Sequence, residues 1–238
     1  MLKKLLATIS LITLLAVPLT SYASVSFNGT SQYVDTGSWS NSLTNITVCT
    51  WVKPTSGTRQ DIVSKWTTNQ YQYDLLQGVT ASKFTFYIST NGSAALSSAN
   101  SVTSIVAGVW YFVCGSYDGA NIKLYVNGSQ EGSNVAQTGN LYGSSVQNNL
   151  IGKSADAAFS GSIDDVRIYN RALSAQEVRA LYLGGNVSNY GLIEWLPLYG
   201  IGSQEIDLSG KRNNGTPVGY TGARKVSTVP PQSSGLYW

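Results

Sequence analysis

Histidine is missing from this sequence and occurs at none of its 238 positions. The commonest serine and cysteine nucleophiles depend on a histidine base, and most zinc sites include histidine ligands. Both classes of active site are therefore excluded. Catalysis would have to rely on carboxylates, and the whole chain has only 12 Asp and Glu residues. The sequence therefore indicates a protein that is not an enzyme.

Long apolar runs are also scarce, and the only one lies at the N-terminus. Lys3 and Lys4 precede an apolar stretch from Leu5 to Leu19, and residues 21–23 end in the small-residue pattern that a signal peptidase recognises. We expect residues 1–23 to be a signal peptide. A signal anchor is the alternative, although the run is short for a span of about 20 residues. We therefore expect a secreted, periplasmic or cell-surface protein with no membrane span after cleavage.

Charge is low and nearly balanced. The chain has 15 basic and 12 acidic residues, and removal of Lys3 and Lys4 with the leader leaves 13 against 12. The remaining basic residues are scattered along the sequence. Nucleic acids and anionic membranes attract concentrated positive charge, so neither is an expected partner.

Turn-forming and strand-forming residues are abundant. The chain contains 24 glycines and 15 tyrosines, a composition typical of all-β proteins with short strands. A mature chain of roughly two hundred residues can form one sandwich without dividing. We predict an antiparallel two-sheet sandwich over residues 24–222 and a weakly ordered tail over residues 223–238.

The segment from Phe159 to Tyr182 predicts a strand, a turn and a short helix in succession. Its first half alternates apolar and polar residues, as a strand does. Ser174 and Glu177 then form the S-x-x-E pattern of a capping box, which marks the start of a helix. Val178 and Leu181 fall on one face of that helix.

This segment resembles the C-terminal signature of laminin-G-like jelly-roll domains in the concanavalin A-like lectin/glucanase group. Five earlier segments resemble strands of the same family in the expected order: VSFNGTSQYVDTG from Val25, NITVCTWVKP from Asn45, IVSKW from Ile62, WYFVCGSYDGANIKLYVNG from Trp110 and NLIGK from Asn149. The resemblance implies an all-β jelly-roll sandwich with one short helix, and a module that binds rather than catalyses. Asn28 replaces the usual Asp of the first turn, and Phe112 replaces the usual His.

Residues 192–218 resemble the element that usually opens these domains, although here they follow the helix. We predict that this segment closes the sandwich as a circularly permuted strand, because the termini of sandwiches often lie close together. The alternative is a truncated second repeat, but about thirty residues cannot bury a core alone. We expect Leu192, Trp195 and Leu198 to be buried against the sandwich.

The only two cysteines are Cys49 and Cys114, each in a predicted strand. The alternation of side chains places both thiols on the face opposite the core. A cross-strand disulfide is one expectation, because the predicted destination is oxidising. The alternative is two buried thiols at positions where the family tolerates Ser or Ala.

The same alternation places Trp51, Trp110 and Phe112 on a face that should be solvated. Sandwiches usually carry polar residues there. Either another part of the chain covers these aromatic side chains, or they form a stacking platform for a ligand. We expect a cover, and the segment after the helix is a candidate for it.

Members of the family often hold one Ca²⁺ with Asp and Asn side chains and backbone carbonyls. The matching positions are Asn28, Asp164 and Asp165, which the resemblance makes candidate metal ligands. The alternative is structural: Asn28 forms a turn, and Asp165 pairs with Arg167 or Arg171.

Glucanases of this group carry their catalytic carboxylates in an E-x-D-x-x-E strand. Glu205 and Asp207 begin that pattern, but Gly210 stands where the second Glu should be. A retaining glycosidase needs both carboxylates. We therefore interpret DLSGKRNNGT as the family's turn element and expect no enzymatic activity.

Ligand contacts are expected from loops and exposed aromatic side chains. Trp66 and Tyr71 flank a polar loop, and flat aromatic faces beside amides suit a sugar ring. The ligand-binding candidates are Trp66, Asn69, Tyr71 and Tyr73. The alternative is that Tyr71 and Tyr73 are ordinary strand residues.

Taken together, these features predict a secreted, non-catalytic recognition module whose leading ligand class is carbohydrate. The alternative function is a structural or adhesive protein of a cell surface or virion. In that case the same fold would contact other protein chains of the surface or assembly.

Overall fold

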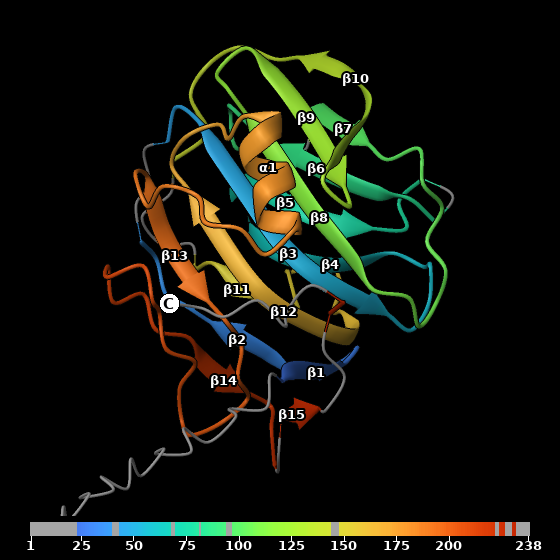
Figure 1. Cartoon of the computed structure of the whole chain (residues 1–238), viewed down its shortest axis with the longest axis vertical. Helices are drawn as coiled ribbons and strands as arrows, with labels where there is room; N and C mark the ends of the chain where they lie inside the picture. The colour runs from blue at the N-terminus through green and yellow to red at the C-terminus, as the bar shows by residue number, and fades with distance from the viewer. Residues whose placement is uncertain are drawn as a thin grey trace, which may run out of the picture.

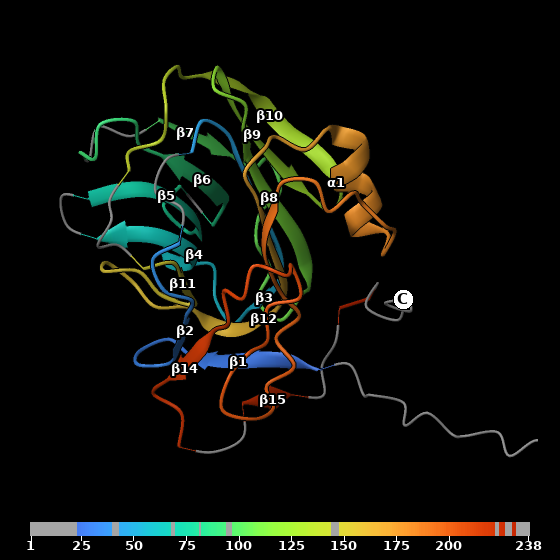
Figure 2. The same cartoon turned by 90° about the vertical axis from the view of Figure 1, so that its left-hand side faces the viewer.

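The computed structural model describes residues 23–39, 43–67, 70–80, 82–93, 97–143, 148–221, 224–226 and 230–231. These residues form two antiparallel sheets packed face to face, with one helix on the outside of the first sheet (Figures 1 and 2). The predicted jelly-roll sandwich with one short helix is confirmed. Most of the predicted signal peptide and of the predicted tail lies outside the described residues. No helix in the described ranges is long and apolar enough to span a membrane.

The first sheet has the strand order β10-β9-β8-β3-β12-β1-β15, and β13 also pairs with β12. Its strands are β1 (Ser24–Asn28), β3 (Ile46–Pro54), β8 (Tyr111–Tyr117), β9 (Asn121–Val126), β10 (Ser129–Ala136), β12 (Ser160–Tyr169), β13 (Leu192–Leu196) and β15 (Lys225–Val226).

The second sheet has the strand order β14-β2-β11-β4-β5-β6-β7. Its strands are β2 (Tyr33–Asp35), β4 (Gln60–Thr67), β5 (Gln70–Gln77), β6 (Phe84–Ile88), β7 (Ser97–Asn100), β11 (Leu150–Ile151) and β14 (Thr216–Val218).

The core lies between the sheets, where alternate side chains of the strands meet. Val48 and Val52 of β3 and Leu75 of β5 are fully buried in this layer. Gly115 of β8 faces the ring of Phe86 of β6 across the core. A Cβ atom on Gly115 would lie 2.1 Å from the Cγ atom of Phe86, so the aromatic ring occupies the space that any other residue would need. This position therefore requires glycine as long as Phe86 keeps its place.

Helix α1 (Ala175–Tyr182) covers the outer face of the first sheet (Figure 2). Ser174 caps its N-terminus, and Glu177 completes the predicted capping box. A second apolar cluster forms beneath the helix from Cys49, Trp51, Phe112, Cys114, Tyr125, Tyr169, Leu173, Val178, Leu181 and Leu192. Trp51 and Phe112 are therefore covered, as expected, whereas Trp110 is only partly buried. Tyr182 of α1 packs against both covered rings, and Leu192 of β13 belongs to the same cluster.

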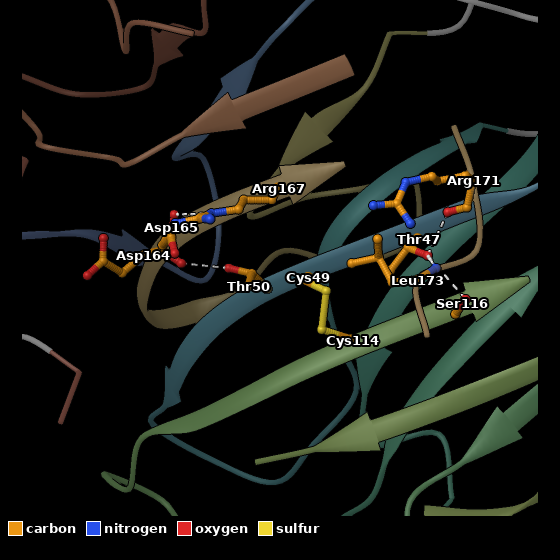
Figure 3. Close-up of a disulfide and its surroundings, with 10 residues drawn as sticks. All are labelled: Thr47, Cys49, Thr50, Cys114, Ser116, Asp164, Asp165, Arg167, Arg171 and Leu173. Carbon is orange, nitrogen blue, oxygen red and sulfur yellow. Dashed lines mark hydrogen bonds and ion pairs between the residues drawn. A yellow bond between two sulfur atoms is a disulfide. The ribbon is translucent and has the colours of Figure 1, made fainter. Parts of the chain in front are cut away.

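Cys49 and Cys114 form the cross-strand disulfide that the sequence suggested (Figure 3). The two residues are directly opposite one another on β3 and β8. Beside them, Thr47 Oγ1 donates to the Arg171 carbonyl at 2.8 Å and accepts from the Leu173 amide at 3.0 Å. These bonds fix the turn that leads into α1, so the disulfide and the helix stabilise the same face.

The C-terminal segment contributes strands to both sheets. β13 pairs with β12, β14 pairs with β2, and β15 pairs with β1. Leu192 and Leu198 are buried, as expected. Trp195 is only half-buried, and its ring centroid lies 4.3 Å from Cζ of Arg167. The segment is therefore part of the sandwich.

Candidate functional site

Trp66 lies near the end of β4 and belongs to an aromatic group on the second sheet. Its ring centroid is 4.3 Å from that of Tyr71 and 6.0 Å from that of Tyr87. The indole Nε1 donates to Asp156 Oδ2 at 3.2 Å. Trp66 is only 5% exposed. Its ring therefore forms part of the wall of a site and does not present an open face for stacking.

A hollow of about 340 Å³ opens beside this tryptophan, within the size range of small-molecule sites. We call it the Trp66 hollow. Tyr33 and Asp35 of β2 and Leu150 of β11 line it together with Trp66 and the loop that contains Lys153. It forms here because β2, β11 and β4 are neighbours in the second sheet.

Polar groups of the Trp66 hollow are held in place by their own contacts. Lys153 Nζ lies 5.0 Å from the centroid of the Tyr33 ring, a cation–π contact. Asn148 Nδ2 donates to Asp35 Oδ2 at 2.9 Å. An aromatic surface is thus combined with an ammonium, an amide and a carboxylate in one concave region.

A second hollow of about 500 Å³ is also lined by the loop at residues 153–155. We call it the Arg59 hollow. Its lining is mostly polar and includes Thr30, Thr58, Arg59 and Asp156. Residues 153–155 line both hollows, so the two share a wall.

Two buried carboxyl groups lie close to the Arg59 hollow. Arg59 Nε is 3.7 Å from Asp61 Oδ1, and Ser154 Oγ donates to the other oxygen of Asp61. Burial raises the pKa of Asp61, and burial followed by repulsion from Asp61 raises the pKa of Asp74 well above its ordinary value. Neither oxygen of Asp74 has a hydrogen-bond partner among the described residues. These groups have no solvent exposure and cannot contact a ligand directly.

The structure separates the predicted ligand-binding residues. Trp66 and Tyr71 come together, whereas Tyr73 is fully buried and donates its hydroxyl to Asn149 Oδ1 at 2.8 Å. The cause is a β-bulge: Trp66 pairs with Tyr71 and the preceding Lys65 with Tyr73, so the alternation is shifted. Tyr73 is therefore a core residue, and Asn69 lies outside the described residues.

Sequence reasoning missed the residues that complete the two hollows. Tyr33, Arg59, Lys153 and Asp156 come from segments far apart in the chain, and only the sheet order unites them. The one signal available was that Tyr33 alternates with the core residue Val34 and so faces outward.

The candidate calcium ligands are buried or engaged in hydrogen bonds within the chain. Asn28 Oδ1 already accepts the amides of residues 30, 31 and 32. Asp165 Oδ1 accepts from Arg167 Nε at 2.9 Å and from Trp195 Nε1 at 2.7 Å (Figure 3 shows the arginine contact). Asp164 is buried, which raises its pKa well above the ordinary value and disfavours the charged form. Within the described ranges, no three His, Cys, Asp or Glu side chains form a metal-ligating group.

Glu205 and Asp207, which begin the glucanase-like pattern, are also committed to structural contacts. Glu205 Oε1 is 3.1 Å from Arg224 Nη2. The Asp207 carboxylate accepts the amides of Trp195 and Asn213 at 2.9 and 2.8 Å. Both residues hold the turn that follows β13, as the interpretation of DLSGKRNNGT predicted.

Solved structures with the same fold come from varied sources. The heptameric SAP-like pentraxin of Limulus polyphemus has 20% identity and a TM-score of 0.58, with 71% of this chain and 85% of that chain covered. The CBM40 of a Ruminococcus gnavus IT-sialidase, bound to α2,3-sialyllactose, has 17% identity and a TM-score of 0.53, with 67% and 96% covered. Domain 4 of an extracellular Geobacillus stearothermophilus arabinanase, in complex with arabinotriose, has 22% identity and a TM-score of 0.50, with 62% and 69% covered. At these identities the likeness establishes the fold alone.

Comparison with curated proteins finds no match. A family comparison does, and the laminin-G-type model described as "Concanavalin A-like lectin/glucanases superfamily" matches residues 28–179. That range runs from the end of β1 into the capped helix, and it covers more than half of the chain. The protein therefore belongs to the concanavalin A-like lectin/glucanases superfamily.

Proposed function

We propose that the protein is a secreted, non-catalytic module that binds carbohydrate in the Trp66 hollow. The observation that carries this proposal is the lining of the hollow, in which the aromatic rings of Tyr33 and Trp66 adjoin Asp35, Asn148 and Lys153. Aromatic faces pack against the C–H groups of a sugar ring, and the polar groups bond its hydroxyls. Small-molecule sites generally combine apolar walls with a few fixed polar groups in this way.

Three further observations support the proposal. The CBM40 and the arabinanase domain, which share the fold, hold sugars in their structures. The sequence has no histidine, and Glu205 and Asp207 are held in a turn, which favours binding over hydrolysis. The Cys49–Cys114 disulfide and the signal-peptide pattern support secretion.

The expected affinity is modest. One sugar ring buries little surface, and ordering the ligand and the side chains opposes binding. A dissociation constant between micromolar and millimolar, about 4 to 8 kcal/mol of binding free energy, is what such a site supplies.

A glycan array followed by calorimetric titration of the hits tests the proposal. Tyr33→Ala removes a wall of the hollow, and we expect it to weaken binding at least tenfold with little change in melting temperature, because Tyr33 is only half-buried. Tyr190→Ala is the matched control, since Tyr190 is 79% exposed and lies outside both hollows.

Two results would contradict the proposal. Glycan binding that Tyr33→Ala leaves intact would place the site elsewhere. Failure of every glycan to bind at millimolar concentration would favour the structural or adhesive function, in which the protein should instead co-purify with other chains of a surface or assembly.

A further inference from the structure

The Trp66 hollow and the Arg59 hollow adjoin each other. Lys153, Ser154 and Ala155 line both, so a ligand that leaves one hollow across this wall enters the other. With volumes of about 340 and 500 Å³, each lies within the range that holds a small ligand. The concave surface therefore extends beyond what a single sugar ring fills.

The two hollows are also joined by one carboxylate. Asp156 Oδ2 accepts from Trp66 Nε1 at 3.2 Å and from Arg59 Nη2 at 3.1 Å. The aromatic wall of the first hollow and the guanidinium of the second are thus fixed by the same oxygen atom. Asp156 positions both groups relative to each other before any ligand is present.

The wall between the hollows is held firmly. Lys153 and Ala158 form an antiparallel bridge, and the Phe159 amide donates to the Gly152 carbonyl at 2.9 Å. Ser154 Oγ accepts the Asp156 amide at 2.9 Å while it donates to Asp61 of β4. A wall tied to the sheet in this way loses little conformational entropy when a ligand spans it.

The two hollows differ in chemistry. Aromatic side chains line the Trp66 hollow, whereas the Arg59 hollow presents hydroxyl, guanidinium and carboxylate groups from Thr30, Arg59 and Asp156 and contains no aromatic residue in its lining. One sugar can stack in the first hollow, and a linked sugar can be held through its hydroxyls in the second.

From this continuity we infer that the ligand is an internal or terminal stretch of a glycan chain, at least two sugars long, that spans both hollows. This inference rests on the proposed carbohydrate function and specifies its ligand class as an oligosaccharide. Monosaccharides fill only the Trp66 hollow and bind more weakly. The additional affinity of longer chains comes from the second sugar, which binds in the Arg59 hollow.

Titration with chains of increasing length tests this. We would use arabinan, cellodextrin and mannan series of one to five units, together with the oligosaccharides found on the array. The expected result for the active series is a rise in affinity of at least tenfold from one unit to three, followed by a plateau. Equal affinity for one unit and for three would overturn the inference and leave the proposed function intact, whereas absence of binding by every series would overturn both.

A variant that blocks the Arg59 hollow tests whether the increase in affinity arises there. Thr30 is exposed at the Arg59 hollow, so Thr30→Trp fills that hollow without removing a buried partner. We expect this variant to abolish the rise in affinity with glycan chain length and to leave the affinity for a single sugar unit unchanged. Thr138→Trp, at an exposed position outside both hollows, is the control. If the Thr30 variant fails to fold, Thr58→Trp, at another exposed position in the lining of the Arg59 hollow, serves in its place. A rise in affinity with chain length that survives in the folded variant would contradict the inference.

Discussion

Cys49 and Cys114 face one another directly across β3 and β8, with 4.1 Å between their Cα atoms. Both are fully buried beneath α1, and the bond joins positions 65 residues apart. The disulfide therefore restricts a long loop of the unfolded chain and anchors the face that the helix covers.

Replacement of both cysteines should lower stability. The double variant Cys49→Ala/Cys114→Ala is expected to lose about 2–4 kcal/mol of unfolding free energy, since the unfolded chain regains the entropy that the cross-link removed. Urea denaturation measures the loss. Mass spectrometry without reduction checks the premise, because two free thiols in the freshly purified protein would contradict it.

Ser174→Ala should loosen the helix. The Ser174 side chain accepts the Glu177 amide, and loss of such a cap costs about 1 kcal/mol. Because Trp51 lies 5.6 Å from Tyr182 of α1, measured between ring centroids, its fluorescence should report the loosening. Ser174→Asp retains a capping oxygen and serves as the control; equal losses in both variants would argue against the cap.

Acid should act on the same helix. Hydrogen bonding from Arg171, opposed by burial, lowers the pKa of Glu177 from 4.5 to about 2. A depressed folded pKa contributes stability that is present above pH 4.5 and lost as pH falls through about 2. Glu177→Gln should therefore be less stable than the parent at pH 6 and should approach it near pH 2. Melting curves of both proteins between pH 2 and pH 6 test this prediction. A difference in melting temperature that stays constant across this range would contradict it.

Glu194 predicts the opposite pH dependence. It is fully buried, accepts from Thr36 Oγ1 and Asn149 Nδ2, and its pKa is raised to about 8 because burial disfavours its charge. A raised folded pKa contributes stability that is complete below pH 4.5 and lost as pH rises through about 8. Glu194→Gln should reduce this decline, whereas Glu131→Gln at a half-buried carboxylate should preserve it. Denaturant titrations between pH 5 and 9 measure the unfolding free energy of each protein. An equal decline with pH in the parent and in Glu194→Gln would refute the prediction.

Trp66→Ala should lower both the stability of the protein and its affinity for ligand, whereas Tyr33→Ala should lower the affinity alone. The Trp66 side chain is 5% exposed and packs on Tyr71. Its removal leaves a cavity and should lower the free energy of unfolding by about 3–5 kcal/mol. Thermal melting of both variants tests the contrast. A Trp66→Ala protein as stable as the parent would mean that the ring makes little contribution to packing.

The features that the sequence predicted correctly depend on local patterns. The capping box of Ser174 and Glu177 and the alternation that places Cys49 and Cys114 on one face are both properties of a few neighbouring residues. The proximity of Trp66 and Tyr71 in the candidate site has the same local origin, because both belong to one hairpin.

The remainder of the site depends on features that the sequence does not display. The bulge at the β4–β5 pair turns Tyr73 into the core, and nothing in QYQYDLL marks it. Tyr33 meets Lys153 only because β2 and β11 are neighbours in the second sheet. Such meetings are set by long-range strand pairing, which local periodicity does not encode.

The pairing of β1 with β15 has a consequence for biosynthesis. Ser24 is matched with Val226, so β1 acquires one of its two neighbours only after residues 225 and 226 have been synthesised. β2 likewise waits for β14. Until then both strands present unpaired backbone edges, which other nascent chains can bind. Folding of this sandwich therefore waits for residues 216–226, and a polypeptide arrested before them would be prone to aggregation although every residue that lines the two hollows is already present.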